Sequence, residues 1–114
     1  LIRLLFFECR PPPRGYGLTQ TGKETTMRAE TKKDALKRMS YIEGHFQGIR
    51  RMVEEEKYCV DILKQTFAVR RAIEKLEGKI LDNHLHTCAI EGIRDGRSDE
   101  VIGELLELYE LANK

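Results

Sequence analysis

The chain has little of several residue types that would place it in other protein classes. Its 114 residues include no tryptophan, three prolines and three cysteines. Three cysteines are too few for a small secreted domain held together by disulfides, and an odd number leaves at least one thiol unpaired. We therefore expect a cytoplasmic protein in a reducing compartment.

Long hydrophobic runs and an excess of one charge are also missing. No apolar segment approaches the roughly 20 residues that a membrane-spanning helix needs. With 40% hydrophobic and 34% charged residues, the composition excludes a disordered tail. The length allows one small domain. We expect a soluble globular protein with no membrane partner.

The net charge of +1 hides a division along the chain. Residues 27–79 carry 13 basic and nine acidic residues, whereas residues 80–114 carry three basic and eight acidic residues. A basic middle segment favours a face that binds a polyanion such as DNA. The candidate phosphate contacts are Lys33, Lys37, Arg38, Arg50, Arg51, Arg70, Arg71 and Lys75. Since no helix-turn-helix spacing is visible, we expect double-stranded DNA to lie against a helical face.

Residues 1–26 differ in pattern from the rest of the chain. A short apolar run is followed by three consecutive prolines and a stretch rich in glycine and threonine. We interpret this segment as a disordered extension, or as sequence upstream of a misassigned start with Met27 as the true first residue. A signal peptide is the weaker interpretation because no cleavage site with small residues follows the apolar run. Residues 27–114 then form the functional domain.

Three helices are predicted from the spacing of apolar residues. A first stripe, with spacings of four and three, predicts a helix over about 31–55 with Thr31 as its N-cap; it consists of Ala35, Met39, Ile42, Phe46, Ile49 and Val53. The same spacing predicts a second helix over about 59–90, through Ile62, Thr66, Val69, Ile73, Leu76 and Ile80. After a break at Gly92 and Gly96, a third helix begins at Ser98 and continues to about Ala112.

The length of the second helix predicts an assembly. At 1.5 Å per residue it extends for roughly 45 Å, whereas a compact domain of this size has a radius of gyration of about 13 Å. Two copies of an all-α, three-helix protomer that pack their long helices as an antiparallel four-helix bundle would cover the apolar stripes. We therefore expect a homodimer.

Cys59, His84 and Cys88 are the candidate metal ligands. His84 and Cys88 are four residues apart and share one face of a helix. Cys59 lies roughly 37 Å from His84 along the same helix, so one chain cannot bring all three to one ion. An antiparallel pair that crosses near Ala72 can, because Cys59 of one copy then lies beside residues 84–88 of the other. Two thiolates and one imidazole favour Cu(I).

Other residues and chemistries fit this pattern less well. Ni(II) would need more nitrogen ligands, and His86 lies about 200° around the helix from His84. We interpret His45 as a packing or DNA-proximal residue. The two cysteines also allow a disulfide or polysulfide bridge, in which case His84 is a polar core residue. No acid/base pair, phosphate loop or nucleophilic triad is visible, so we expect no enzyme.

The stretches EGHFQGIRRM, YCVDILKQTFAVR and NHLHTC resemble the copper-sensing repressors of the CsoR/RcnR family, over about residues 31–112. The resemblance implies a homotetramer, built as a dimer of dimers, that binds operator DNA when metal-free and releases it when Cu(I) binds, so that copper-export genes are expressed. It places Cys59, His84 and Cys88 at the copper positions. It also implies that Tyr58 and Glu104 connect the site to the third helix and that Arg38 and Lys75 bear on operator binding.

Some residues depart from the pattern common in this family. Tyr41 and Gln47 stand where many members have arginine, which bears on the DNA contacts and not on copper. Nickel- and cobalt-sensing relatives have histidine at the position of Cys88, and sulfur-sensing relatives lack His84. The remaining alternatives are a repressor that responds to persulfide or thiol oxidation and a copper-buffering bundle that does not bind DNA.

Overall fold

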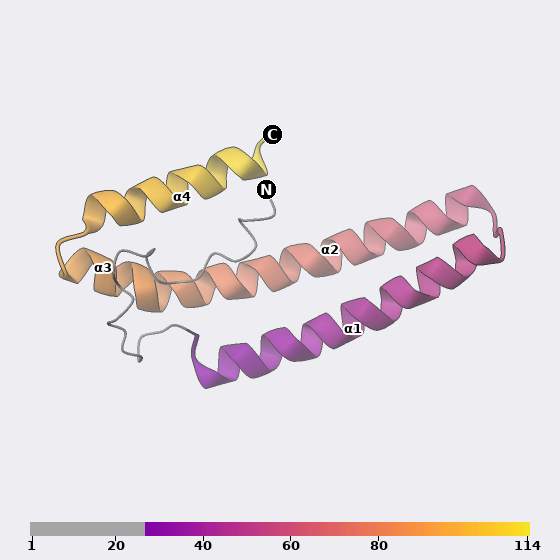
Figure 1. Cartoon of the computed structure of the whole chain (residues 1–114), viewed down its shortest axis with the longest axis horizontal. Coiled ribbons are helices and arrows are strands. Elements are labelled where there is room, and N and C mark those ends of the chain that lie inside the picture. Colours follow the sequence, from indigo (N-terminus) through magenta and orange to yellow (C-terminus); the bar gives the residue numbers. More distant parts are fainter. Residues whose placement is uncertain (1–26) are drawn as a thin grey trace. The chain divides into compact units, whose positions relative to one another are not determined.

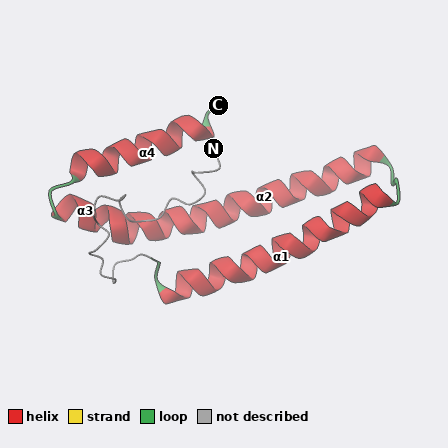
Figure 2. Ribbon diagram, viewed as in Figure 1, coloured by secondary structure: helices red, strands yellow, loops and turns green. Residues whose placement is uncertain are grey.

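The computed structural model describes residues 27–114, and our expectations for residues 1–26 lie outside this range. The elements are α1 (Ala29–Glu54), α2 (Cys59–His84), a π-helical segment η4 (Leu85–Ala89), α3 (Ile90–Arg94) and α4 (Ser98–Ala112). Figures 1 and 2 show these helices and the short turns between them. The residues from 27 to 114 contain no strand, which confirms the predicted all-α class.

The described chain divides into two compact units, which we treat separately. In the first, Arg28–Asp82, α1 and the main part of α2 form an antiparallel hairpin (Figure 1). The turn between them contains Glu56 with a positive φ of 55°. The Tyr58 carbonyl then accepts hydrogen bonds from the backbone N–H groups of Asp61 and Ile62, which starts α2.

The predicted apolar stripes are only partly buried within the chain. Ala35 and Ile49 on α1, and Val69 and Leu76 on α2, are buried. Phe46 belongs to the same stripe as Ile49, yet it is 59% exposed. A large apolar side chain left in water forfeits its burial energy of about 1.5–3 kcal/mol. The hairpin therefore presents apolar surface that the described chain does not cover.

The first helix begins earlier than predicted. It starts at Ala29, and its N-cap is Arg28, which makes no side-chain capping hydrogen bond. The backbone N–H of Lys32 donates to the Arg28 carbonyl over 2.9 Å, so Thr31 already lies in the first turn. Our assignment of Thr31 as the N-cap was therefore wrong, because helical backbone extends upstream of it.

The second helix is longer and less regular than predicted. Helical backbone continues from Cys59 to Arg94, but the five residues of η4 interrupt the α-helix with a π-helical turn. The prediction of one uninterrupted α-helix over 59–90 was wrong at this turn. Apolar periodicity did not indicate it, because a single wide turn changes the helical phase by less than one residue.

In the second unit, the residues from 83 to 114, α3 and α4 pack closely at one point. A Cβ atom added to Gly92 on α3 would lie 2.6 Å from the Cγ2 atom of Val101 on α4. Gly96, in the turn between these helices, has a φ of +84° that favours glycine. α4 begins at Ser98 as predicted, with Asp99 and Glu100 in its first turn. None of the helices described has the length and apolar character required to cross a membrane.

Candidate metal centre

Cys59 and His84 are the first and last residues of the same helix, α2. At 1.5 Å per residue they are separated by roughly 37 Å along its axis. Cys59 is an exposed free cysteine. Its thiol is therefore accessible to a group supplied from outside its own helix end.

His84 is half-buried, and its surroundings favour the neutral imidazole. Removal from solvent lowers the pKa of His84 below its usual value, because burial disfavours the charged ring. A neutral imidazole has a nitrogen lone pair available for a metal ion. His86, two residues on, is exposed, as expected for a residue on another face of the helix.

Cys88 lies inside η4, one turn beyond His84. The side chain is half-buried, and its sulfur takes part in a disulfide in this structure. A thiolate ligand is available at this position only after that bond has been reduced. Any metal chemistry at Cys88 therefore belongs to the reduced protein.

The described residues of one chain do not assemble a metal site by themselves. Within residues 27–114, no three side chains of His, Cys, Asp or Glu come together closely enough to hold a metal ion. The chemistry of the three candidates still fits a soft ion, since two thiolates and one imidazole are ligands suited to Cu(I). Donors from a second copy would be needed to complete the set.

The two residues expected to connect the site to other helices lie on separate elements. Tyr58 precedes α2 and is 69% exposed. Glu104 is half-buried on α4. Burial raises the pKa of Glu104, and the nearby charge of Glu100 raises it further. A carboxyl group in such surroundings is sensitive to small changes in its hydrogen-bond partners.

The hairpin brings most of the candidate DNA contacts to one level. A hydrogen bond of 2.7 Å joins His45 Nε2 on α1 to Gln65 Oε1 on α2. Because the helices are antiparallel, residues seven positions before His45 lie alongside residues seven positions after Gln65. Arg38 is therefore level with Ala72, which is flanked by the basic residues of α2. The basic side chains that share this part of the hairpin are Lys33, Lys37, Arg38, Arg70, Arg71 and Lys75.

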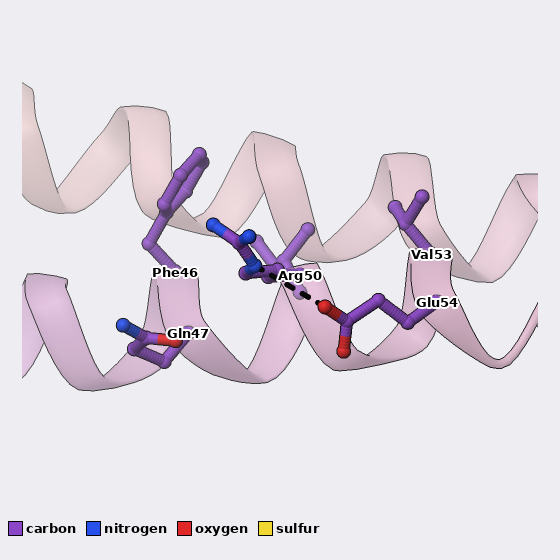
Figure 3. Close-up of a pocket in the computed structure, with 6 residues that line it drawn as sticks. Phe46, Gln47, Arg50, Val53 and Glu54 are labelled. Carbon is purple, nitrogen blue, oxygen red and sulfur yellow. Dashed lines mark hydrogen bonds and ion pairs between the residues drawn. The ribbon is translucent and has the colours of Figure 1, made fainter.

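Two of the candidate DNA contacts are engaged by carboxylates of their own helix. Arg38 donates to Asp34 over 2.9 Å, and this hydrogen bond lowers the pKa of Asp34. Arg50 donates to Glu54 over 3.3 Å at the edge of an open groove on α1. Figure 3 shows this pair, with Phe46 on the same helix. Each pairing offsets part of the positive charge that a phosphate would meet.

The aromatic and the unpaired basic residues of α2 complete this surface. The guanidinium of Arg70 lies over the ring of Phe67, 5.7 Å from its centroid. Lys33, Lys37, Arg71 and Lys75 are exposed and form no salt bridge with another described residue. The surface therefore keeps most of its positive charge available to a polyanion.

Comparison with protein families assigns the chain. A model described as "Metal-sensitive transcriptional repressor" matches residues 31–110. The chain belongs to this family. Two of its relatives are copper-sensing transcriptional repressors called CsoR. The chain from Mycobacterium ulcerans is 41% identical over 78 residues, which cover 68% of this chain and 67% of that protein. The Bacillus subtilis protein is 39% identical over 77 residues, covering 68% and 76%.

Solved structures of metal-sensitive repressors share the fold. The copper-sensing repressor CsoR with Cu(I) from Geobacillus thermodenitrificans aligns with a TM-score of 0.74 and 30% identity, over 82% of this chain and 97% of that chain. The nickel-responsive transcriptional regulator InrS aligns with a TM-score of 0.59 and 28% identity, over 80% and 97%. The resemblance drawn from the sequence motifs is thus confirmed.

One residue at the candidate site escaped the analysis of the sequence. The hydroxyl of Thr87 donates to the Asn83 carbonyl over 2.7 Å, within the segment that joins His84 to Cys88. Threonine four residues after a helical carbonyl often makes such a bond, so the spacing contained a signal. The π-helical turn around it had none that a periodicity search can detect.

Proposed function

We propose that this metal-sensitive repressor responds to Cu(I). In this proposal the metal-free protein binds operator DNA in the cytoplasm, and Cu(I) binding releases it, so that copper-resistance or export genes are expressed. The observation that supports it most is the donor set. Cys59 and the pair His84 and Cys88 supply two sulfurs and one nitrogen, a combination that favours Cu(I) over Ni(II) or Zn(II).

The site is proposed to lie between two copies of the chain. Cys59 begins α2 and His84 ends it, so an antiparallel partner helix places the complementary ligands at each end. The exposed apolar residues of the hairpin, among them Phe46 and Val53, supply surface that such a partner would bury. A homodimer, and a homotetramer formed as a dimer of dimers, would also duplicate the basic surface for a twofold DNA site.

The residues of the chain have distinct parts in this proposal. Bound Cu(I) would supply a fixed, soft centre that holds groups from two helices at once. His84 would bind through one ring nitrogen and donate a hydrogen bond through the other, which connects it to Tyr58 and Glu104. A shift of these residues on metal binding would change the geometry of the helical bundle, and with it the fit of the basic surface to DNA.

An anaerobic DNA-release experiment tests the proposal. A labelled duplex is selected from a random pool by the reduced, metal-free protein, and Cu(I) is added while fluorescence anisotropy reports binding. We expect release as the sites fill. His84→Ala should remain bound over the same range of Cu(I), because it lacks the nitrogen ligand.

The same assay separates the alternative functions. Release by polysulfide or an oxidant, with no response to Cu(I), would replace the copper proposal with a thiol-responsive repressor. Tight Cu(I) binding by a protein that selects no duplex from the pool would indicate a copper-buffering bundle. Normal Cu(I) affinity and normal release by His84→Ala would contradict the assignment of the ligands.

A further inference from the structure

The segment between His84 and Cys88 contains a side-chain hydrogen bond that metal ligation does not explain. Thr87 Oγ1 donates to the Asn83 carbonyl oxygen over 2.7 Å. The same hydroxyl oxygen lies 3.8 Å from the Sγ atom of Cys88. Because a hydroxyl has one hydrogen and the carbonyl contact is much the shorter, the hydrogen points toward the carbonyl. Thr87 therefore links the backbone just before His84 to the sulfur of Cys88.

This hydroxyl acts where the helix is least regular. η4 spans Leu85–Ala89, and in a π-helical turn the usual bonds from each N–H to the carbonyl four residues earlier are interrupted. The backbone is α-helical on both sides, with φ −61° and ψ −42° at His84 and φ −63° and ψ −43° at Ile90. The Thr87 bond spans four residues and encloses His84, so it restrains the backbone on entry to the wide turn.

The surroundings strengthen the bond. Asn83 is 3% exposed and Ala89 is 5% exposed, and Thr87 between them is half-buried. Water competes weakly for a carbonyl in such a place, so a side-chain donor there contributes more than it would on the surface. Removal of the hydroxyl takes one partner from the Asn83 carbonyl and frees the rotamer of Thr87.

We propose that Thr87 is a positioning residue of the metal site, whose hydroxyl holds the π-helical turn so that the His84 imidazole and the Cys88 sulfur are presented to one ion. This inference rests on the proposed function for the identity of the ion. Thr87 itself supplies no metal ligand. Its effect is on the arrangement of the two neighbours that do.

Hydroxyl-free and hydroxyl-retaining variants of the full, reduced chain test this role. Thr87→Val keeps the shape of the side chain without the hydroxyl, and Thr87→Ala removes the hydroxyl while giving the highest helix propensity. Thr87→Ser retains the hydroxyl. Thr66→Val is the matched control, because Thr66 on α2 makes a similar bond, of 2.8 Å to the Leu63 carbonyl, away from the ligands.

Two measurements are made, one of them without metal. Amide hydrogen exchange of the metal-free protein should show faster exchange over residues 84–90 in Thr87→Val and Thr87→Ala than in the wild type. Competition with a Cu(I) chelator should show about ten-fold weaker binding by these two variants, the usual effect of losing a group that orients a ligand. Thr87→Ser should restore both values, and Thr66→Val should change neither.

The outcomes distinguish this inference from the proposed function. If the wild type lacks tight Cu(I) binding, the proposed function fails, while the exchange data still report on the turn. If the wild type binds Cu(I) and both hydroxyl-free variants bind it equally well, the positioning role is contradicted. Thr87→Ser behaving like Thr87→Val would also contradict it, because the hydroxyl would then not be the group responsible.

Discussion

The imidazole of His45 on α1 and the amide of Gln65 on α2 are joined by a hydrogen bond of 2.7 Å between Nε2 and Oε1. Tyr41 packs edge-on against the same imidazole, with ring centroids 6.2 Å apart. This is a side-chain link between the two helices of the hairpin, and it sets their register. The register in turn places the basic residues of both helices at one level, where we propose that DNA binds.

The His45–Gln65 bond is expected to contribute measurably to stability. A double-mutant cycle with His45→Ala and Gln65→Ala should give a coupling free energy of about 0.5–1 kcal/mol, toward the low end for a hydrogen bond because the pair is exposed. Urea unfolding at a fixed protomer concentration measures it. Additive single and double variants would show that the bond does not fix the register.

Gly92 is expected to be intolerant of a larger side chain. Gly92→Ala should destabilise the protein by about 1–3 kcal/mol, the usual cost of overpacking, because the new Cβ would lie 2.6 Å from Val101 Cγ2. Gly103→Ala on α4 is the control, since nothing lies within 4 Å of its added Cβ. That variant should be neutral or stabilised through higher helix propensity. If Gly92→Ala unfolds at the wild-type urea midpoint, α3 and α4 do not pack as described.

The stability of the metal-free protein should depend on the ionisation of Glu104. Its pKa is raised above the usual 4.5 in the folded state, chiefly by burial, so the folded protein holds this proton more tightly than the unfolded chain. The favourable contribution is present below pH 4.5 and is lost as the pH rises through the folded-state pKa. Glu104→Gln should therefore be more stable than the wild type at neutral pH, and the difference should shrink toward acid pH.

Unfolding curves at several pH values measure this difference. Glu110→Gln removes the same charge near the exposed end of α4 and controls for net charge. An advantage of Glu104→Gln that persists unchanged down to about pH 3, below the usual carboxyl pKa, would mean that the substitution acts through packing.

The two kinds of basic residue on the hairpin should differ in their effect on DNA binding. Lys75 is exposed without a salt bridge to another described residue, whereas Arg50 donates to Glu54. Lys75→Ala should weaken binding to all duplexes and reduce the slope of log affinity against log salt by about 1 for each phosphate that is no longer neutralised. Arg50→Ala should have the smaller effect. Fluorescence anisotropy at several salt concentrations compares them, and an equal effect would place the DNA nearer the hairpin turn.

Much of the helical framework was predictable from the sequence. Apolar spacing located the start of α2 at Cys59 and of α4 at Ser98, and both are confirmed, because long periodic stripes and the turn residues between them are strong signals. The start of α1 was missed by two residues, since Thr31 offered a capping side chain that the chain does not use. Helix ends depend on single capping bonds, which the stripe does not encode.

The candidate site was predictable in its chemistry but not in its local backbone. The donors Cys59, His84 and Cys88 were evident from residue type and spacing, and they stay a prediction as a ligand set. The π-helical turn from Leu85 to Ala89 was not, because it depends on the packing of buried residues such as Asn83 and Ala89. The exposure of Phe46 was also missed, because periodicity identifies an apolar face and not the partner that covers it.

Mixing of two inactive variants tests the central claim, that each Cu(I) site is shared between two chains. Cys59→Ala lacks one half of every site, and His84→Ala combined with Cys88→Ala lacks the other half. The two proteins are unfolded together, refolded at equal amounts under reducing conditions and titrated with Cu(I) against a competing chelator. Random pairing should restore tight binding to about a quarter of the wild-type capacity, because half of the dimers are mixed and each has one complete site. No recovery in the mixture, with the variants shown to exchange subunits, would contradict a site formed between chains.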